Sequence, residues 1–502
     1  MSPRTSDILI DLLPLLVVLI SLLIGLLIFI AGEQRQLLRT ILNLSAAVVK
    51  LVLIGIIAAL VLSGREPEFR MALLPGLDLV LRFDALSLLF STLSAVLWLV
   101  TTVYAIAYLE RSRHQARFFG FFSICVASTM GIASAGNLFT FFIFYELLTL
   151  STWPLVVHSG SARAIAAGRS YLRYTLGGST LFLFGLVWLY GLTQDPAFVP
   201  GGQVSHLVAT HRLDLQIIFL LLMLGMGVKA ALVPLHSWLP KAMVAPAPVS
   251  ALLHAVAVVK AGVFGLVRLV LDIYGFETAA ELGMTAVLAG LASLTIIYGS
   301  VLALRQQDLK KRLAFSTVSQ VSYIALGVAI GGPAATIGGL VHLVHQGLMK
   351  VTLFFCAGIF DRAFGIRRID QLDGIGRRAP WTAACFTVGA LGMTGTPPIA
   401  GFVTKWYLGT GVVMAGQAWV LGVLVASTLL NAAYFLPIIR RIWFEPLSNP
   451  ALAANTLNRM ETGGMILPTV ATAFLSLAVA LMAGHPLSPL SWVKIIAEDY
   501  FP

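Results

Sequence analysis

In Gly225-Met-Gly-Val-Lys229-Ala-Ala-Leu-Val-Pro234, a lysine lies inside an apolar run that ends in a proline. Proline lacks a backbone N–H donor, so a helix that reaches Lys229 is expected to break just beyond it. At membrane depth, a broken helix is tolerated where it lines a polar cavity. The alternative is a proline kink that serves packing alone.

The same arrangement recurs later in reversed order, in Gly392-Met-Thr-Gly-Thr-Pro397-Pro398-Ile-Ala-Gly401-Phe-Val-Thr-Lys405-Trp406. Here the Pro/Gly interruption comes before the lysine. Two interrupted apolar segments in corresponding halves of one chain are typical of transporters built from internal repeats. The sequence therefore predicts a repeat architecture with two broken helices.

The composition places the chain in a lipid bilayer. It has 502 residues, of which 58% are hydrophobic and 11% are charged, whereas soluble proteins carry about 25% charged residues. This balance excludes both an ordinary soluble fold and a disordered chain. The net charge of +11 is assigned to membrane loops, since no basic segment is interleaved with aromatic residues, and no nucleic-acid partner is expected.

The apolar runs predict an all-α polytopic membrane protein with about 14 transmembrane helices, since each span needs roughly 20 apolar residues. The expected spans are 8–30, 38–63, 84–108, 118–134, 138–157, 171–192, 215–234, 248–271, 282–303, 311–330, 335–360, 381–411, 417–439 and 463–484. The first is too long for the core of a cleavable signal peptide.

Basic residues mark one membrane face. Most of the 33 lysines and arginines lie in every second loop, such as 305–312 and 362–378. Because cytoplasmic loops carry the excess of Lys and Arg, both termini are expected to be non-cytoplasmic. The expected location is the bacterial inner (plasma) membrane.

A small set of basic residues lies inside the expected helices, although charge at bilayer depth is costly. These residues are Lys50, Lys229, Lys260, Arg268, Lys350 and Lys405. For Lys50, snorkelling and a contact with a partner subunit both remain open. Asp84 stands at an expected helix start and is a candidate N-cap.

Glu146 and three histidines complete the interior set. Glu146 is interpreted either as part of a fixed ion pair between helices or as part of a switchable pair that gates proton movement. His254 and Lys260 are six residues apart, so they face successive partners. His342 and His345 share a helix face, which suits a proton relay; a polar seam between helices and a zinc site without a visible third ligand are the alternatives.

Motifs for cofactors and enzymatic chemistry are missing from the sequence. There is no GxGxxG, GxxxxGK[ST] or GxSxG motif, and Cys125, Cys356 and Cys385 lack metal-ligand spacing. No cofactor or metal is therefore expected. The chain is expected to be an ion-transport subunit without a redox or hydrolytic site of its own, rather than an enzyme.

At this point the residues resemble a known family, the proton-translocating antiporter-like subunits of Mrp cation/proton antiporters, respiratory complex I and membrane-bound hydrogenases. The most specific motifs are Pro234-Leu-His-Ser-Trp-Leu-Pro240 and Ala245-Pro-Ala-Pro-Val-Ser-Ala-Leu-Leu-His254-Ala-Val-Ala-Val-Val-Lys260. Supporting motifs are Phe144-Tyr-Glu146-Leu-Leu-Thr, Asp308-Leu-Lys-Lys-Arg312 and Thr396-Pro-Pro-Ile-Ala-Gly401.

The resemblance implies two inverted five-helix repeats. The expected parts are N-terminal helices in 1–110, a first repeat in 117–272, a second repeat in 281–441, and a last helix with its tail in 460–502. It also implies roles for the interior residues, as an expected set of proton-transfer groups. Glu146 pairs with Lys229, a central axis follows, and Lys405 stands at the exit; the axis consists of His254, Lys260, His342, His345 and Lys350.

Within this family, the motifs look most like the branch of the Mrp D subunit. The implied function is proton translocation in a multisubunit monovalent cation (Na⁺)/proton antiporter, with other hydrophobic subunits as partners and protons and Na⁺ as the ions. The alternative is a proton-pumping membrane subunit of respiratory complex I or of a membrane-bound hydrogenase. Lys405 argues against the complex I branch that carries glutamate at this position.

Overall fold

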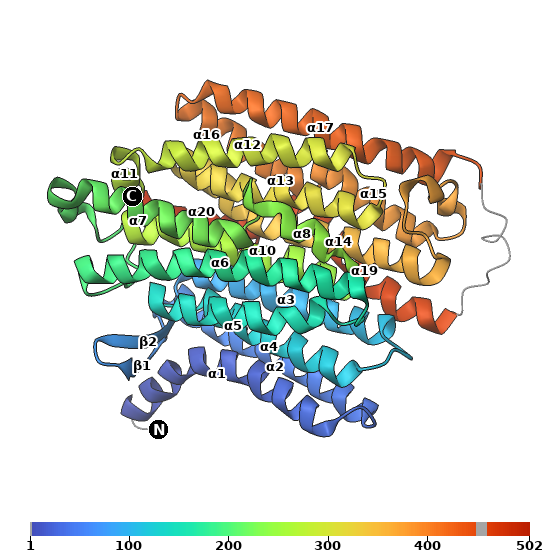
Figure 1. The fold of residues 1–502 in the computed structure, drawn as a ribbon, viewed down its shortest axis with the longest axis horizontal. Helices are drawn as coiled ribbons and strands as arrows, with labels where there is room; N and C mark the ends of the chain where they lie inside the picture. The colour runs from blue at the N-terminus through green and yellow to red at the C-terminus, as the bar shows by residue number, and fades with distance from the viewer. Residues whose placement is uncertain (1–2, 448–458, 502) are drawn as a thin grey trace.

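The computed structural model describes residues 3–447 and 459–501, and these form a bundle of long, roughly parallel helices (Figure 1). The chain is a multi-pass membrane protein: twelve helices in the described ranges are long and apolar enough to span a bilayer. The N-terminal elements are α1 (Pro3–Ala31), α2 (Gln36–Leu62), β1 (Glu68–Leu74), β2 (Leu77–Arg82) and α3 (Ala85–Tyr108).

The middle of the chain contains the first broken helix. Its helices are α4 (Gln115–Ala133), α5 (Leu138–Val156), α6 (Ala162–Thr193), α7 (Val208–Lys229), α8 (Trp238–Lys241), α9 (Ala247–Ala251), α10 (Val258–Arg268) and α11 (Phe276–Glu281).

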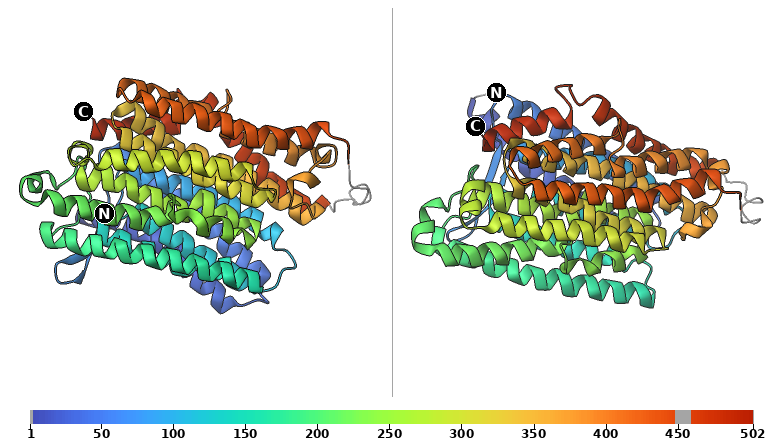
Figure 2. Two further views of the ribbon diagram at one scale, coloured as in Figure 1. Left: turned by 45° about the horizontal axis from the view of Figure 1, so that its top comes forward. Right: turned by 90° about the horizontal axis from the view of Figure 1, so that it is seen from above.

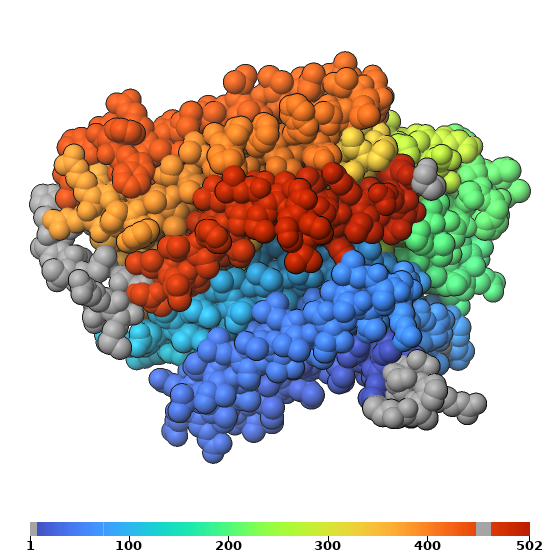
Figure 3. Space-filling model, turned by 180° about the vertical axis from the view of Figure 1, so that it is seen from behind, coloured from blue at the N-terminus to red at the C-terminus, as the bar shows by residue number. Residues whose placement is uncertain are grey.

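The last part contains the second broken helix. Its helices are α12 (Met284–Leu304), α13 (Leu309–Ile330), α14 (Pro333–Phe364), α15 (Pro380–Thr394), α16 (Ala400–Met414), α17 (Ala418–Phe444), α19 (Arg459–Leu481) and α20 (Pro489–Tyr500). Seen from behind, the C-terminal segment lies between the N-terminal helices and the helices that precede it (Figure 3).

Helix α14 is the centre of the bundle. Its most apolar 18-residue window is completely buried, whereas the corresponding window of α2 is 28% buried. The turned views show the long helices packed side by side, with α6 and α17 on the outside (Figure 2). Large apolar side chains such as Leu37 and Phe444 are exposed on the outer helices, which is the distribution that a lipid solvent favours.

Both predicted breaks are confirmed. Helix α7 ends at Lys229, ahead of Pro234, and α15 and α16 are separated by a break that contains Pro397 and Pro398. The first break is fixed by the Trp238 indole, whose Nε1 donates to the Val228 carbonyl at 2.8 Å. The broken ends are therefore packed and hydrogen-bonded inside the protein.

The prediction of one continuous helix over 248–271 is wrong. It is interrupted by a π-helical turn at Leu252–Val256, by non-helical backbone at Ala257, and by a second π-helical turn at Leu269–Tyr274. No proline lies between Pro248 and Tyr274 to signal this. Twelve continuous spans and the interrupted segments 248–271 and 381–411 together account for the predicted number of about 14.

The hairpin β1–β2 and the helix α20 were not predicted from the sequence. The two strands pair antiparallel, and β2 extends its hydrogen bonding onto the turn between α4 and α5, where Arg82 N donates to the Ser134 carbonyl at 2.6 Å. The start of α1 and the end of α20 lie at this same end of the bundle (Figure 1). The hairpin depends on these tertiary partners, which the local sequence does not reveal.

A buried ion cluster joins the hairpin end to α10 and α20. The Arg268 guanidinium lies 2.8 Å from carboxylate oxygens of both Asp84 and Asp272, and the Tyr500 hydroxyl donates to Asp272 at 2.7 Å. Asp84 also caps α3 by accepting from Ser87 N, which confirms the predicted N-cap. Arg268 is thus an interior basic residue whose charge is paired with two carboxylates.

Replacing Arg268 by methionine is expected to destabilise the fold strongly, because Asp272 is left buried without its cation. Loss of one partner from a buried pair costs about 3–5 kcal/mol, so the melting temperature of the purified protein in detergent should fall sharply. The matched control is Arg212→Met, since Arg212 and Glu281 form an exposed pair of the kind that contributes about 1 kcal/mol or less. Equal melting temperatures for the two variants would contradict this account.

Candidate functional site

Four lysines lie inside the bundle on α7, α10, α14 and α16, and we refer to them as the interior lysines: Lys229, Lys260, Lys350 and Lys405. The first three are completely buried. Each of the four donates a hydrogen bond from Nζ to a backbone carbonyl of another element. The acceptors are Tyr145 on α5, Leu343 on α14, Leu313 on α13 and Thr394 at the end of α15.

Three of the carbonyl contacts have ordinary hydrogen-bond lengths. The distance from Nζ to the carbonyl oxygen is 2.8 Å for Lys260, 3.2 Å for Lys350 and 2.6 Å for Lys405. Lys229 also lies over the Tyr145 ring, with Nζ 3.2 Å from the ring centre. The tyrosine hydroxyl in turn donates to the Gly225 carbonyl of α7.

In the described part of the chain, no interior lysine has a carboxylate within ion-pair distance. A carbonyl oxygen accepts a hydrogen bond from a charged or a neutral amine alike. A proton can therefore leave such a lysine without stranding a buried carboxylate, which is the costly event in a paired site. The arrangement suits lysines that change charge.

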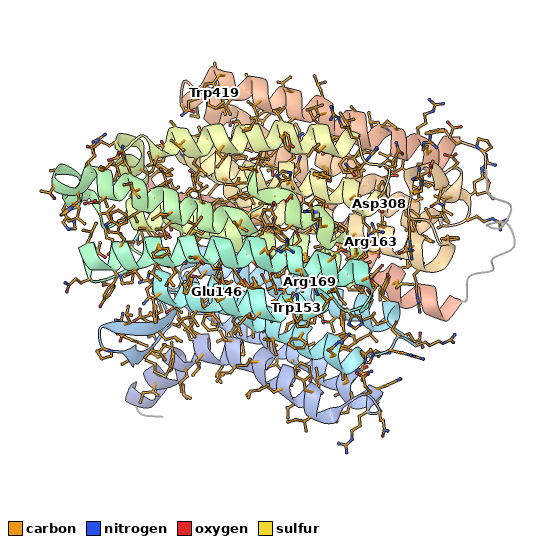
Figure 4. All side chains as sticks on the ribbon, in the orientation of Figure 1. Glu146, Trp153, Arg163, Arg169, Asp308 and Trp419 are labelled. Atoms are coloured by element: carbon orange, nitrogen blue, oxygen red, sulfur yellow. The ribbon has the colours of Figure 1, made fainter. Side chains whose placement is uncertain are left out.

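Glu146 lies on α5, away from both ends of that helix (Figure 4). It is half-buried and accepts a hydrogen bond from the Ser179 hydroxyl of α6. Within the described residues the structure does not form the ion pair with Lys229 that was expected. Lys229 instead binds the carbonyl of Tyr145, the neighbour of Glu146 in the chain.

The second break places Lys405 against the end of α15. The last carbonyls of a helix lack intrahelical partners, and one of these, on Thr394, accepts from Lys405 Nζ. Gly395 has a φ of +88°, and a Cβ there would lie 2.6 Å from Cδ of Lys405. A second bond, 2.8 Å long, runs from Nζ to the Thr428 hydroxyl on α17.

His342 and His345 converge on one hydroxyl group of α16. Their Nδ1 atoms lie 3.3 Å and 3.0 Å from Oγ1 of Thr404, the residue before Lys405. His254 lies in the first π-helical turn and packs its ring 4.6 Å from that of Phe354 on α14. The structure thus brings the three histidines onto or against the central helix.

Several buried polar atoms around α14 have no hydrogen-bond partner in the described protein. They are both ring nitrogens of His254, Nε2 of His342 and His345, both amide atoms of Gln346, Nε2 of Gln320 and the hydroxyl of Tyr323. Buried polar groups require partners, and bound water commonly supplies them. This concentration makes the surroundings of α14 suitable for hydration.

Lys50 stands apart from this group. On α2, it donates to the Ser21 hydroxyl of α1 and lies 4.5 Å from the ring centre of Trp98. Lys50 is completely buried by these contacts within the chain, so it neither snorkels to the membrane surface nor presents its side chain to a partner subunit. Lys50 is therefore a buried lysine that the axis does not include.

The hydroxyl partners were missed by sequence analysis. Ser179, Ser316, Thr404 and Thr428 each contact an ionisable group from another helix. Serine and threonine in a helix also bond to the carbonyl four residues earlier, so their presence in an apolar segment does not reveal which of them face a charge. No group of three potential metal-ligating side chains occurs among the described residues.

The fold and the buried ionisable groups define a polytopic membrane subunit of the ion-translocating class. Residues 135–431 match the family described as "NADH:quinone oxidoreductase/Mrp antiporter, TM", and the chain belongs to this family. It is 36% identical to NADH-quinone oxidoreductase subunit N of Desulforudis audaxviator over 389 residues, which are 76% of this chain and 75% of that protein.

Antiporter subunits are also relatives. The chain is 35% identical to the putative antiporter subunit mnhA2 of Staphylococcus haemolyticus, with 69% of this chain and 45% of that protein covered. For a probable K⁺/H⁺ antiporter subunit of Rhizobium meliloti, the values are 34%, 75% and 37%. The chain thus spans less than half of these two antiporter relatives, and the D branch remains a prediction.

Solved membrane complexes share the fold. A chain of the Mrp complex from Dietzia sp. superposes with a TM-score of 0.84 at 24% identity, and 98% of this chain and 100% of that chain are covered. A chain of respiratory complex I from Thermus thermophilus gives 0.80 at 23% identity, with 98% and 99% covered. These likenesses establish the overall fold.

Replacing Lys350 by methionine is expected to preserve or raise the melting temperature of the purified protein. Lys350 has no carboxylate partner in the described structure, so its removal strands no charge, and exchanging buried charge for apolar volume is often neutral or stabilising. Thermal denaturation in detergent, beside Arg268→Met, measures the difference. A fall as large as that of Arg268→Met would contradict the carbonyl-bound account of the interior lysines.

Proposed function

We propose that this chain is the proton-translocating subunit of a multisubunit monovalent cation (Na⁺)/proton antiporter. The observation that carries the proposal is the set of interior lysines, each bound by a backbone carbonyl in place of a carboxylate. Such lysines can alternate between charged and neutral forms without leaving a buried carboxylate unpaired. Kinship with antiporter subunits supports the same assignment.

In this proposal, protons pass along a row of groups that crosses the bundle. The row starts at Glu146 and Lys229, continues through His254 and Lys260 to the groups of α14, and ends at Lys405. Closing of a Glu146–Lys229 pair would draw the Lys229 ammonium away from the Tyr145 carbonyl and change the charge that Lys260 experiences. The gating role of Glu146 therefore involves a movement from its present partner, Ser179.

The proposal includes the two inverted repeats, in 117–272 and 281–441, with one broken helix in each. Each proposed repeat contributes one lysine beside its break, Lys229 before the first break and Lys405 after the second. It also includes the bacterial plasma membrane, non-cytoplasmic termini and other hydrophobic subunits as partners. The chain itself would hold no redox or hydrolytic site.

Replacing Lys229 by alanine is expected to reduce cation-dependent proton movement by at least about tenfold, since a positioned proton-transfer group typically contributes about 10²–10⁴-fold. Glu146→Ala should have a comparable effect because the gate is lost. The measurement is Na⁺-dependent dissipation of a pH gradient in everted vesicles that contain the whole complex and no other antiporter.

Lys50→Ala is the matched control, because Lys50 is also a buried lysine but lies on α2 with Ser21 and Trp98. It is expected to transport at the wild-type rate in complexes of equal abundance. Wild-type rates for both Lys229→Ala and Glu146→Ala would overturn the proposed function.

A second candidate function rests on the relative of the respiratory class. The NADH-quinone oxidoreductase subunit N of D. audaxviator is matched over three quarters of both chains. In this case the chain would be a proton-pumping membrane subunit of a redox complex, complex I or a membrane-bound hydrogenase.

Native mass spectrometry of the purified complex separates the two candidates. The antiporter assignment predicts several small hydrophobic subunits and no iron–sulfur protein. Iron–sulfur subunits in stoichiometric amount would establish the redox assignment in its place. The measurement uses the complex extracted from its own membrane, so it does not depend on any variant.

A further inference from the structure

The contact of two histidines with a single threonine restricts how their protons are placed. A hydroxyl group has one O–H donor and accepts through its oxygen. Thr404 can therefore donate to the Nδ1 of only one histidine at a time, while its oxygen can accept N–H from the Nδ1 of the other. A proton relay through this oxygen requires opposite tautomers of His342 and His345, whose Nδ1 atoms lie 3.3 Å and 3.0 Å from it.

From this geometry, and resting on the proposed function, we infer that the Thr404 hydroxyl is a proton-relay group that connects His342 to His345. Thr404 would then be an uncharged residue of the proton path. The i, i+3 spacing of the two histidines fits this role, because two side chains on one helix face can reach one hydroxyl.

The step balances for one proton. A proton is added to Nε2 of the first histidine, which then gives its Nδ1 proton to the threonine oxygen. At the same time the threonine O–H proton passes to Nδ1 of the second histidine, which releases a proton from its own Nε2. The hydroxyl ends with one proton, as it began, and each ring ends neutral in its other tautomer.

The outer ends of this relay are open. Nε2 of both histidines is buried and has no hydrogen-bond partner in the described protein. The Tyr323 ring lies 5.4 Å from that of His342, and its hydroxyl is also without a partner in this part of the chain. Entry and release of the proton therefore occur at atoms that are free to bind water.

Close packing of two helices holds the relay. Gly411 of α16 approaches the start of α14 so closely that a Cβ there would lie 2.3 Å from Ala335 N. Small residues at such contacts let membrane helices approach at short range. Thr404 is completely buried, so the relay joins the central helix to α16, the helix that also carries Lys405.

The test is a series of substitutions at Thr404 in the whole complex, measured as Na⁺-dependent proton movement in vesicles. Thr404→Ser keeps the hydroxyl and should retain the wild-type rate within about twofold, whereas Thr404→Val should lower it by about tenfold or more. Thr404→Ala should lie between them, because it leaves room for a bridging water. A packing role predicts the reverse order, since valine has the shape of threonine.

Two controls test whether valine is tolerated elsewhere. Thr469 on α19 is buried and bonds to the Met465 carbonyl of its own helix, and Thr410 on α16 bonds to the Trp406 carbonyl. Thr469→Val and Thr410→Val should transport normally. Thr404→Val at the wild-type rate, while Lys229→Ala is inactive, would overturn the relay alone; activity of Lys229→Ala and Glu146→Ala would overturn the proposed function itself.

A measurement on the unaltered protein covers the case in which Thr404→Val does not assemble. Solid-state NMR of ¹⁵N-histidine in the complex, with His342→Asn and His345→Asn for assignment, reports which ring nitrogens carry protons. The relay predicts one of the two histidines protonated at Nδ1 and the other unprotonated there. The same Nδ1 state in both rings would overturn it.

Discussion

The proposed function places one constraint on the structure: a charge at membrane depth must be stabilised and must still be able to move. The interior lysines meet it through backbone carbonyls, as Lys260 does at Leu343 and Lys350 at Leu313. A carbonyl dipole stabilises an ammonium group, and the same oxygen still accepts a hydrogen bond after the amine has lost its charge. These two carbonyls belong to the continuous helices α14 and α13.

Arg268 shows the opposite solution in the same protein. It is held by Asp84 and Asp272, and Tyr500 completes the cluster, so its charge is fixed and its role is structural. Lys405 is held without a counter-ion, because the end of a helix has free carbonyls and Lys405 binds the one on Thr394. The charge of Arg268 is thus stabilised by carboxylates, whereas the interior lysines are stabilised by the dipoles of backbone carbonyls.

Much of the fold follows from the sequence, because lipid imposes long apolar segments and Pro234 and Pro397 mark the two breaks. The ionisable residues of the site were equally visible, since charges stand out in an apolar helix. The π-helical turn at His254 and the hairpin were not, because packing rather than local composition stabilises them. Thr404 could not be identified, since its contacts lie 59 and 62 residues away and nothing local distinguishes it from other threonines.

The central claim is that the interior lysines change charge during transport. It is tested most directly by ¹⁵N-lysine solid-state NMR of the complex in liposomes, with an imposed Na⁺ gradient and with Lys260→Met and Lys350→Met for assignment. The account predicts that signals of Lys260 and Lys350 divide between amine and ammonium forms, in a ratio that changes with the gradient. Ammonium signals alone, unaltered by the gradient, would contradict it.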